Sequence, residues 1–302
     1  MERLLSAIHE EFRGEILPDE LMISHTSWRI GGPAELFLLP EDSSDLIVLL
    51  QVLNRYNAPW VVIGNGTNLL VKDGGIAGAV ISLARFDAID IDVEGLVRVE
   101  AGTSLPRLIR QTVSQGLQGL EGLAGIPGSV GGAVLMNAGA GDSEIGSRVE
   151  TVTLVGPQGE RILTRKEAGF CYRASNLSEK GIITSTTLRL QPSDINSLQK
   201  ACTEKLSWRR HVQAVVGSHA GSVFKNPPGA KAWELIDAAG LRGERRGDAV
   251  ISPVHCNHIV NLDQATAQDV LELVALTRQR VKEQSGIDLE LEVHIVGREV
   301  MS

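Results

Sequence analysis

The sequence has few cysteines, no excess of basic residues and no long apolar run. Its three cysteines, Cys171, Cys202 and Cys256, form no C-x-x-C pair, so the pattern indicates neither a disulfide framework nor a zinc cluster. No segment reaches the roughly 20 apolar residues that cross a membrane. The acidic start from Met1 to Arg13 also lacks the apolar segment of a signal peptide. These absences predict a protein of the reducing cytoplasm that does not insert into membranes.

The charge balance and the histidines argue against three further classes. A net charge of -8 argues against a nucleic-acid partner, which calls for a basic face, although an anionic ligand responds to local charge. His255 and His258 lie three residues apart without a third ligand nearby, so no metal site is predicted. No His or Asp stands at a spacing from Ser222 that identifies a hydrolytic triad.

Glycine, in contrast, is abundant. Glycines recur every few residues from Glu121 to Gly141 with almost no charge between them, which is typical of neither a helix nor an ordinary strand. One interpretation is a concave row of main-chain N–H groups that suits a pyrophosphate. The alternative is a tight crossover packed in a core, which carries no chemistry.

A second glycine loop favours the ligand interpretation. Trp60–Ile63 is predicted to be a buried strand that runs into Gly64-Asn65-Gly66-Thr67-Asn68. Leu69 stands where a dinucleotide fingerprint needs its third glycine, and no Gly-Lys-Ser/Thr of a Walker A loop follows. Two such loops about sixty residues apart favour a cofactor with a long diphosphate and a second polar ring system.

These loops and four further motifs resemble the UDP-N-acetylenolpyruvoylglucosamine reductase family, the FAD enzymes of bacterial peptidoglycan synthesis. The matching segments run in order from about Ile23 to Gly297. They are Ser27-Trp28-Arg29-Ile30-Gly31-Gly32-Pro33-Ala34, Gly64–Leu70, Gly125–Gly132, Tyr172-Arg173-Ala174-Ser175, Gly221-Ser222-Val223-Phe224-Lys225-Asn226-Pro227 and Leu289-Glu290-Leu291-Glu292-Val293.

The resemblance implies an α+β fold, with a two-lobed FAD-binding unit of the vanillyl-alcohol-oxidase type followed by a smaller α+β substrate-binding domain. The length favours two or three domains. We place an N-terminal extension at residues 1–20, the two FAD-binding lobes at 21–85 and 86–195, and the substrate domain at 196–302. The extension is predicted to be a helix with an acidic connection. Predicted elements elsewhere include a strand at Trp28–Gly32, a helix from Asp45 to Tyr56 with Ser43 or Ser44 as N-cap, and a final strand at Leu289–Val296. We also predict a helix at Ser104–Gln115 closed by Gly116, a hairpin of Val149–Val155 and Arg161–Thr164, and a capped helix from Thr266 to about Glu283.

The reaction that the resemblance implies reduces the enolpyruvyl double bond of UDP-N-acetylglucosamine enolpyruvate and gives UDP-N-acetylmuramate. NADPH is the hydride donor, and FAD, held noncovalently between the lobes, passes the hydride to the terminal methylene carbon. The expected partners are therefore the nucleotide sugar and NADPH, without nucleic acid, in a monomer or weak oligomer.

The resemblance also assigns the FAD contacts to the two glycine loops. The residues are Gly64, Asn65, Gly66, Thr67, Asn68, Leu69, Gly125, Ile126, Pro127, Gly128, Ser129, Gly131, Gly132, Asn137, Ala138 and Gly139.

Three residues are carried over as catalytic. The reaction needs a cation near the substrate carboxylate and a proton donor at the adjacent carbon, so Arg173, assisted by Glu292, fits the first role and Ser222 the second. On the residues alone, three alternatives stay open: a surface Arg stacked on Tyr172, a turn Ser, and an exposed polar strand edge around Glu292. The candidate substrate-binding residues are Tyr172, Arg210, Gln213, Lys225 and Asn226.

Departures from the family pattern leave these groups in place. Leu291 stands where the family often has Pro, and His258 where an aromatic residue is common. The short interval between Arg173 and Ser222 leaves little room for an inserted tyrosine loop, which predicts the branch of the family without it. Two rivals remain: an FAD-dependent oxidase of the same fold, often with covalently bound flavin, and a non-catalytic nucleotide-sugar-binding protein. No His or Cys lies in either glycine loop, which argues against a covalent link.

Overall fold

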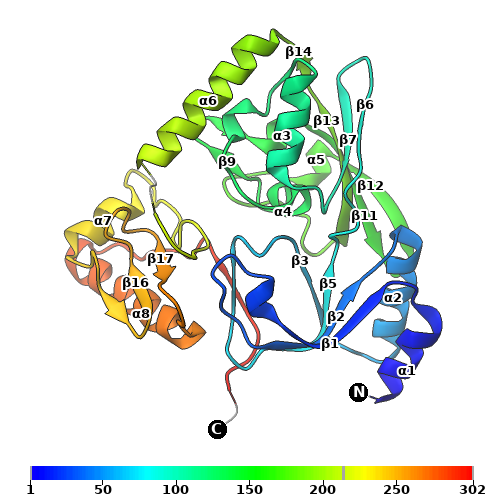
Figure 1. Cartoon of the computed structure of the whole chain (residues 1–302), viewed down its shortest axis with the longest axis horizontal. Helices are drawn as coiled ribbons and strands as arrows, with labels where there is room; N and C mark the ends of the chain where they lie inside the picture. The colour runs from blue at the N-terminus through cyan, green and yellow to red at the C-terminus, as the bar shows by residue number, and fades with distance from the viewer. Residues whose placement is uncertain (1, 213–214, 301–302) are drawn as a thin grey trace. The chain divides into compact units, whose positions relative to one another are not determined.

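The computed structural model describes residues 2–212 and 215–300, which fall into two units (Figure 1). Unit 1 comprises Met1–Leu17, Leu36–Asn65 and Gly78–Trp208, and unit 2 comprises Pro18–Glu35, Gly66–Ala77 and Arg209–Ser302. Each unit thus draws on three stretches of chain. The limits expected after residues 20, 85 and 195 follow the motifs and stay a prediction.

Unit 1 contains a five-stranded sheet with the order β12-β11-β13-β7-β6 and most of a four-stranded sheet with the order β1-β2-β5-β3. Two small pairs, β10-β9 and β14-β8, complete it. The strands are β1 (Glu15–Leu21), β2 (Pro33–Leu39), β3 (Trp60–Ile63), β5 (Ile76–Ser82), β6 (Ile89–Ile91), β7 (Leu96–Glu100), β8 (Leu117–Gln118), β9 (Gly139–Ala140), β10 (Ser143–Glu144), β11 (Val149–Gly156), β12 (Gly159–Thr164), β13 (Ile182–Arg189) and β14 (Gln191–Pro192).

Unit 1 also contains most of the helices. They are α1 (Glu2–Glu11), α2 (Ser43–Arg55), α3 (Leu105–Ser114), α4 (Val130–Leu135), α5 (Arg165–Ala168) and α6 (Ile195–Val212), with short 3₁₀ turns at Glu121–Leu123 and Ile145–Ser147. Of these helices, α2, α4 and α5 pack on the five-stranded sheet. Figure 1 shows α4 beside β7 and β13, on which it packs, while α2 packs on β11 and on α1. The glycine stretch therefore does contain a helix, α4, contrary to prediction, because Ser129 caps it with a bond from the N–H of Gly132 at 3.3 Å.

The structure confirms several elements that were predicted from local sequence signals. The helix predicted after Ser104 is α3, which ends at Gly116 in the left-handed region with φ 69°. The predicted hairpin is β11–β12, whose two-residue turn joins Gly156 to its cross-strand partner Gly159. Its inner strand β11 also pairs with β13, which places the hairpin at one edge of the five-stranded sheet.

The start of the chain differs in part from prediction. Helix α1 is confirmed, but the expected acidic connection is the strand β1. Helix α2 is capped by Asp42, which accepts a bond from the N–H of Asp45 at 2.9 Å, and not by Ser43 or Ser44. Asp42 takes this role because its backbone is extended and its carboxylate also binds Arg13 at 2.8 Å.

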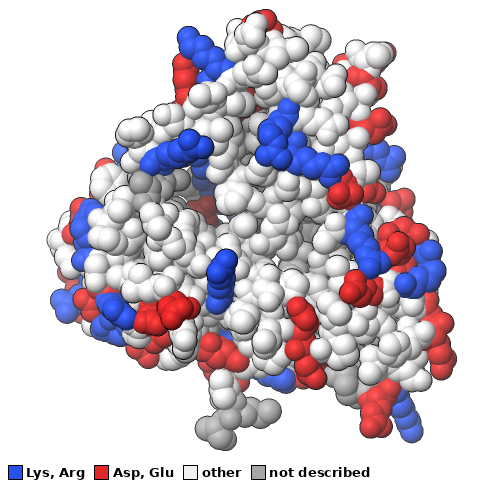
Figure 2. All heavy atoms as spheres, in the orientation of Figure 1, with Lys and Arg blue, Asp and Glu red and all other residues white. Residues whose placement is uncertain are grey.

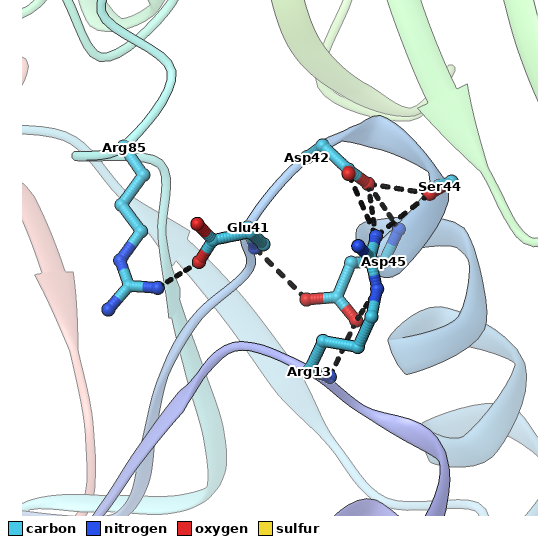
Figure 3. Close-up of polar contacts among 6 residues, drawn as sticks. All are labelled: Arg13, Glu41, Asp42, Ser44, Asp45 and Arg85. Atoms are coloured by element: carbon cyan, nitrogen blue, oxygen red, sulfur yellow. Dashed lines mark hydrogen bonds and ion pairs between the residues drawn. The ribbon is translucent and has the colours of Figure 1, made fainter.

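The side chains around this cap form a polar network within unit 1 (Figure 3). The carboxylate of Asp45, 1% exposed, accepts from the N–H of Arg13 at 2.8 Å and from that of Glu41 at 3.0 Å. The Ser44 hydroxyl and Arg13 hold the pKa of Asp42 below its usual range. Arg85 pairs with Glu41 nearby. The network ties the segment after α1 to the start of α2.

Unit 2 packs short strands and two helices around its own core. Its elements are the 3₁₀ turn Met22–Ser24, β4 (Leu69–Val71), α7 (Ala232–Ala238), β15 (Arg245–Arg246), β16 (Ala249–Ile251), β17 (Ile259–Asn261), α8 (Ala267–Ser285) and β18 (His294–Val296). β15, β16 and β17 form a sheet against which α8 packs, and β18 pairs in parallel with β4. Helix α8 begins after the N-cap Thr266, as predicted, with a capping box of Thr266 and Asp269, and it reaches Ser285, two residues beyond the predicted end near Glu283.

Two predicted strands of unit 2 are corrected. Trp28–Gly32 is not a strand, because Arg29 and Gly31 have positive φ angles of 55° and 143°. Trp28 is fully buried, and its indole N–H donates to the carbonyl of Ile259 at 2.7 Å. The final strand covers only His294–Val296, while Leu289–Val293 runs before it in irregular structure with one bridge at Leu291.

The surface carries both signs of charge. Figure 2 shows acidic and basic side chains interspersed over the face in view. Within the described part of the chain, no helix combines the length and the apolar character that crossing a membrane requires.

Candidate active site

A cavity of about 350 Å³ in unit 1 brings the two glycine loops together. Strands β3 and β5 are parallel neighbours, so the segments that follow Ile63 and Ser82 leave the sheet at the same edge. The cavity opens there and is lined by Trp60, Val61, Val62, Ile63, Gly64, Asn65, Ser82, Leu83, Ala84, Ala101, Gly102, Ser129, Gly131, Gly132, Leu135, Ser178, Gly181, Ile182 and Ile183. Its volume lies in the range of ligand sites, roughly 300–1,000 Å³.

Close approach explains the glycines at this cavity. A Cβ atom on Gly64 would lie 2.3 Å from Oγ of Ser129, and one on Gly131 would lie 2.8 Å from Cβ of Ala101. On Gly132 the nearest atom would be Ser129 Oγ at 3.4 Å, an ordinary contact. Gly64 thus allows the two loops to approach each other, Gly131 allows the second loop to pack on Ala101 after β7, and Gly132 leaves room beside the cavity. The packing interpretation of the glycine stretch therefore holds at Gly131, and the ligand interpretation stays a prediction for Gly132.

The lining suits a flavin dinucleotide. Its walls are apolar side chains and main chain, with the side chains of Asn65, Ser82, Ser129 and Ser178 as polar groups. None of the lining residues in the described chain carries a charge, and none is His or Cys. A dinucleotide would thus meet hydroxyl, amide and main-chain donors, and a Cβ on Gly64 would narrow the space.

The other predicted FAD contacts lie apart from this lining. Gly125 and Gly128 have φ angles of 87° and 117°, values that favour glycine, and the Gly128 carbonyl accepts from the N–H of Leu105 at 2.9 Å. The remaining ones in unit 1 are Ile126, Pro127, Asn137, Ala138 and Gly139, and those in unit 2 are Gly66, Thr67, Asn68 and Leu69. Their FAD contacts stay predictions; for Asn137 such a contact would come from the main chain, because its side-chain amide is bonded to Glu144, Cys171 and Gly146.

Arg173 stands on a tight turn of unit 1. Cys171 and Ala174 exchange main-chain hydrogen bonds of 3.0 and 3.2 Å, so Tyr172 and Arg173 form a two-residue loop. Arg173 has a φ of 56°, and its guanidinium carbon lies 5.3 Å from the centre of the Tyr172 ring. A Cβ on Gly139 would lie 3.3 Å from Nη1 of Arg173. The guanidinium is thus stacked on Tyr172, as the surface interpretation holds, and also lies against the glycine stretch.

Ser222 and Glu292 are brought close together in unit 2. Phe224 and Leu291 are antiparallel bridge partners, and the carbonyl of Val223 accepts from the N–H of Glu292 at 2.8 Å. Ser222 and Glu292 therefore lie on two paired segments. The carbonyl of Glu292 also accepts from Nδ2 of Asn68 at 3.0 Å.

Asn257, which the sequence did not single out, holds the segment that carries Ser222. Its main-chain carbonyl accepts from the N–H of Val223 at 2.9 Å, and its side-chain oxygen accepts from the N–H of Phe224 at 3.0 Å. Its side-chain nitrogen donates to the carbonyl of Phe224 at 2.8 Å. The available signal was an amide residue between Cys256 and His258, just before the strand Ile259–Asn261.

The candidate substrate residues differ in their surroundings. Lys225 forms an ion pair with Glu290, and Oδ1 of Asn226 accepts from the N–H of Ala232 at 3.0 Å at the start of α7. Tyr172 and Arg210 are exposed, and Gln213 lies outside the described residues. Their roles stay predictions.

Three histidines, His219, His255 and His258, cluster near the segment that carries Ser222. The ring of His258 meets those of His255 and His219 edge to face, with centroids 4.5 and 5.1 Å apart. Burial, together with the two neighbouring rings, lowers the pKa of His258 to about 3, so the ring is neutral at pH 7. In the chain as described, no group of three or more His, Cys, Asp or Glu could hold a metal ion.

Comparison with known proteins defines the class. A family model described as an FAD binding domain matches residues 34–165, and one described as the C-terminal domain of UDP-N-acetylenolpyruvoylglucosamine reductase matches residues 211–296. The first match contains the residues that line the cavity up to Leu135. The protein is an FAD-dependent oxidoreductase with a separate C-terminal domain.

Full-length relatives give the family. The UDP-N-acetylenolpyruvoylglucosamine reductases of Syntrophotalea carbinolica and Geobacter metallireducens are 42% and 43% identical to the chain, covering 94% and 99% of it and 97% and 99% of themselves. The crystal structure of the Thermus caldophilus reductase matches with a TM-score of 0.80 and 40% identity, over 94% of this chain and 98% of that one. The chain belongs to the UDP-N-acetylenolpyruvoylglucosamine reductase family.

More distant structures support the fold class. A berberine bridge enzyme variant matches with a TM-score of 0.51 and 16% identity, over 64% of this chain and 44% of that one. A berberine-bridge-like protein of Physcomitrella patens matches with a TM-score of 0.50 and 15% identity, over 63% and 44%. The predicted α+β fold of the vanillyl-alcohol-oxidase type, with a further C-terminal domain, is confirmed.

Proposed function

We propose that this protein reduces the enolpyruvyl group of UDP-N-acetylglucosamine enolpyruvate to UDP-N-acetylmuramate with NADPH, in the cytoplasm, for peptidoglycan synthesis. We place it in the branch without the tyrosine loop and expect a monomer or weak oligomer. The observation that carries the activity is the match of both domains to one reductase family, combined with a glycine-lined cavity in the domain that matches FAD-binding proteins.

Residues of unit 1 would hold the cofactor and orient the substrate. When bound, FAD takes a hydride from NADPH and delivers it to the methylene carbon of the enolpyruvyl group. Gly64, Gly132 and Ser129 would hold the dinucleotide with main-chain and hydroxyl groups. Arg173 would bind the substrate carboxylate, where negative charge develops as the double bond is reduced. Its planar guanidinium offers two parallel donors to the two carboxylate oxygens.

Residues of unit 2 would complete the reaction. Ser222 would donate the proton to the carbon beside the carboxylate, and Lys225 would stabilise the resulting alkoxide. Glu292, on the segment paired with that of Ser222, would polarise or protonate the carboxylate. Arg210, Gln213 and Asn226, together with Tyr172 of unit 1, would bind the rest of the nucleotide sugar.

A two-step anaerobic titration tests this function. NADPH should bleach the flavin absorbance of the purified protein, and the enolpyruvyl nucleotide sugar should restore it in the absence of oxygen. Recovery only after oxygen is admitted would identify the oxidase alternative. A colourless protein that takes up no FAD would identify the binding-protein alternative. The uncharged cavity lining without His or Cys favours noncovalent FAD, so acid or heat should release the flavin.

A further inference from the structure

Asn137 is buried, and its side-chain amide is bonded entirely within the protein. It is 1% exposed and has a φ of 44°, in the left-handed region. Its Nδ2 donates to the Glu144 carboxylate and to the main-chain carbonyl of Cys171, both at 2.9 Å, and its Oδ1 accepts from the N–H of Gly146 at 3.0 Å. Both amide hydrogens are therefore used inside unit 1, and the side chain keeps no donor for FAD.

The bond to Cys171 joins Asn137 to the turn of Arg173. The Cys171 carbonyl accepts from the N–H of Ala174 at 3.2 Å, which closes the two-residue loop, and also from Asn137. The loop is held a second time, because the hydroxyl of Ser175 donates to the carbonyl of Leu135 at 2.7 Å. Both anchors come from the stretch of chain that also lines the cavity at Leu135.

Gly146 also approaches the Asn137 side chain closely, at its Oδ1 atom. A Cβ on Gly146 would lie 2.6 Å from Oδ1 of Asn137, so the pairing requires glycine there. Two residues after Asn137, Gly139 lies against the Arg173 guanidinium, where a Cβ would come within 3.3 Å of Nη1. One short segment therefore binds the base of the turn and also lies beside its guanidinium.

We propose that Asn137 is a positioning residue for Arg173: its amide fixes the Cys171–Ala174 turn relative to the glycine stretch and so directs the guanidinium toward the substrate carboxylate. This inference rests on the proposed function, in which Arg173 acts on that carboxylate. A misplacement of about 1 Å can slow a reaction by up to about 10²-fold, so loss of this amide should slow the step that uses Arg173 and spare the others.

The test is Asn137→Gly, because glycine tolerates the left-handed backbone without strain. Flavin content and the rate of bleaching by NADPH should stay within about twofold of the parent protein, while reoxidation by the enolpyruvyl substrate should slow about 10–10²-fold. Added to Arg173→Ala, Asn137→Gly should slow reoxidation by less than about twofold more, because its effect passes through Arg173. Asn137→Ser, whose side chain is too short to bond both Glu144 and the Cys171 carbonyl, gives the same expectation should the glycine variant not fold.

Ser147→Ala is the matched control, since it removes a 2.7 Å bond from the Ser147 hydroxyl to the Glu144 carbonyl in the same loop and leaves the Asn137 amide intact. It should match the parent protein in both half-reactions. Lost flavin, equal slowing of both half-reactions, or full additivity with Arg173→Ala would overturn the positioning role. If the enolpyruvyl substrate does not reoxidise the parent protein itself, the proposed function is wrong, and the role of Arg173 on which the inference rests is wrong too. If the parent protein is reoxidised and only the Asn137 variants behave otherwise than expected, the positioning role alone is wrong.

Discussion

At the scale of single residues, the contact between Gly64 and Ser129 gives a sharp prediction. Gly64→Ala places a methyl group 2.3 Å from Ser129 Oγ, so the Ser129 hydroxyl, which caps α4, or the loop that carries it must shift. Overpacking costs about 1–3 kcal/mol, which corresponds to FAD binding weaker by roughly 5–150-fold. Quenching of flavin fluorescence during titration of the apoprotein measures the dissociation constant.

Gly156→Ala is the control for Gly64→Ala, because its Cβ would have its nearest neighbour, Oε1 of Gln158, at 3.8 Å. It should bind FAD as the parent protein does. Unchanged affinity in Gly64→Ala would mean that this shift occurs without cost and that Gly64 does not shape the FAD site.

Ser222 is tested by the two half-reactions. Only the second needs a proton at carbon, so Ser222→Ala should leave bleaching by NADPH near normal and slow reoxidation by about 10²–10⁴-fold or more. Stopped-flow absorbance separates the two steps, and Ser218→Ala, in the same chain segment, is the control. Equal slowing of both steps would make Ser222 structural, and no slowing would make Glu292 the preferred donor.

Site residues could be predicted from the sequence where they belong to a local pattern, such as the glycine spacing of a loop. Gly64 and Ser129 stand in loops whose glycine spacing is visible in the sequence, and the structure brings them to one cavity. Asn137 and Asn257 act through main-chain partners far along the chain, Cys171 and Phe224. Such partners leave no local pattern, so the sequence could not identify these two roles.

At the scale of elements, the connection from Ser252 to His258 between β16 and β17 should make stability depend on pH. The folded pKa of His258 is about 3 because of burial, whereas an unfolded histidine titrates near 6.5. Below about pH 6.5 the unfolded chain therefore binds the extra proton, and stability is lost as the pH falls toward 3, by up to about 1.4 kcal/mol per pH unit. Burial also lowers the pKa values of His255 and His219, which adds in the same direction.

His258→Phe should remove the larger part of this dependence. Differential scanning calorimetry should show a smaller drop in Tm between pH 7.5 and pH 5 for the variant than for the parent protein. His9→Gln, at an exposed position of α1, should keep the parent dependence. An identical drop in His258→Phe and the parent would show that His258 is not the group that titrates.

Elements with a cap or a turn in the sequence were predicted well, and those defined by distant pairing were not. Helix α8 has its capping box and its terminal glycine in the sequence, and it forms as predicted. Trp28–Gly32 has the composition of a strand, but tertiary packing of Trp28 and the left-handed Arg29 override that preference. The end of the chain forms a strand only where β4 is available as a partner.

At the scale of the whole molecule, the composition of unit 2 predicts that the C-terminal part cannot fold alone. Its core includes Trp28, Ile30 and Leu70, each no more than 2% exposed, which come from earlier in the chain. Loss of one such side chain costs about 2–5 kcal/mol, against a total stability of about 5–15 kcal/mol. A fragment of residues 209–302 should therefore show no cooperative thermal transition by circular dichroism.

Trp28→Ala in the full chain is the companion measurement and should lower the stability by about 3–5 kcal/mol. A cooperative transition in the fragment would contradict the prediction and would support an independent domain with the limits that the sequence suggests. The two units interleave along the chain, and the domain limits inferred from the order of the motifs stay a prediction. Membership of a core depends on distant contacts, which a single sequence does not display.

The interleaving also bears on how the protein is made on the ribosome. Trp28 and Ile30 are synthesised early, but β18 and α8, which complete unit 2, come roughly 240–260 residues later. At about 5–20 residues per second, that interval lasts roughly 12–50 s. During this time an indole and several aliphatic side chains lack their final partners, so the nascent chain offers chaperones a binding segment until translation ends.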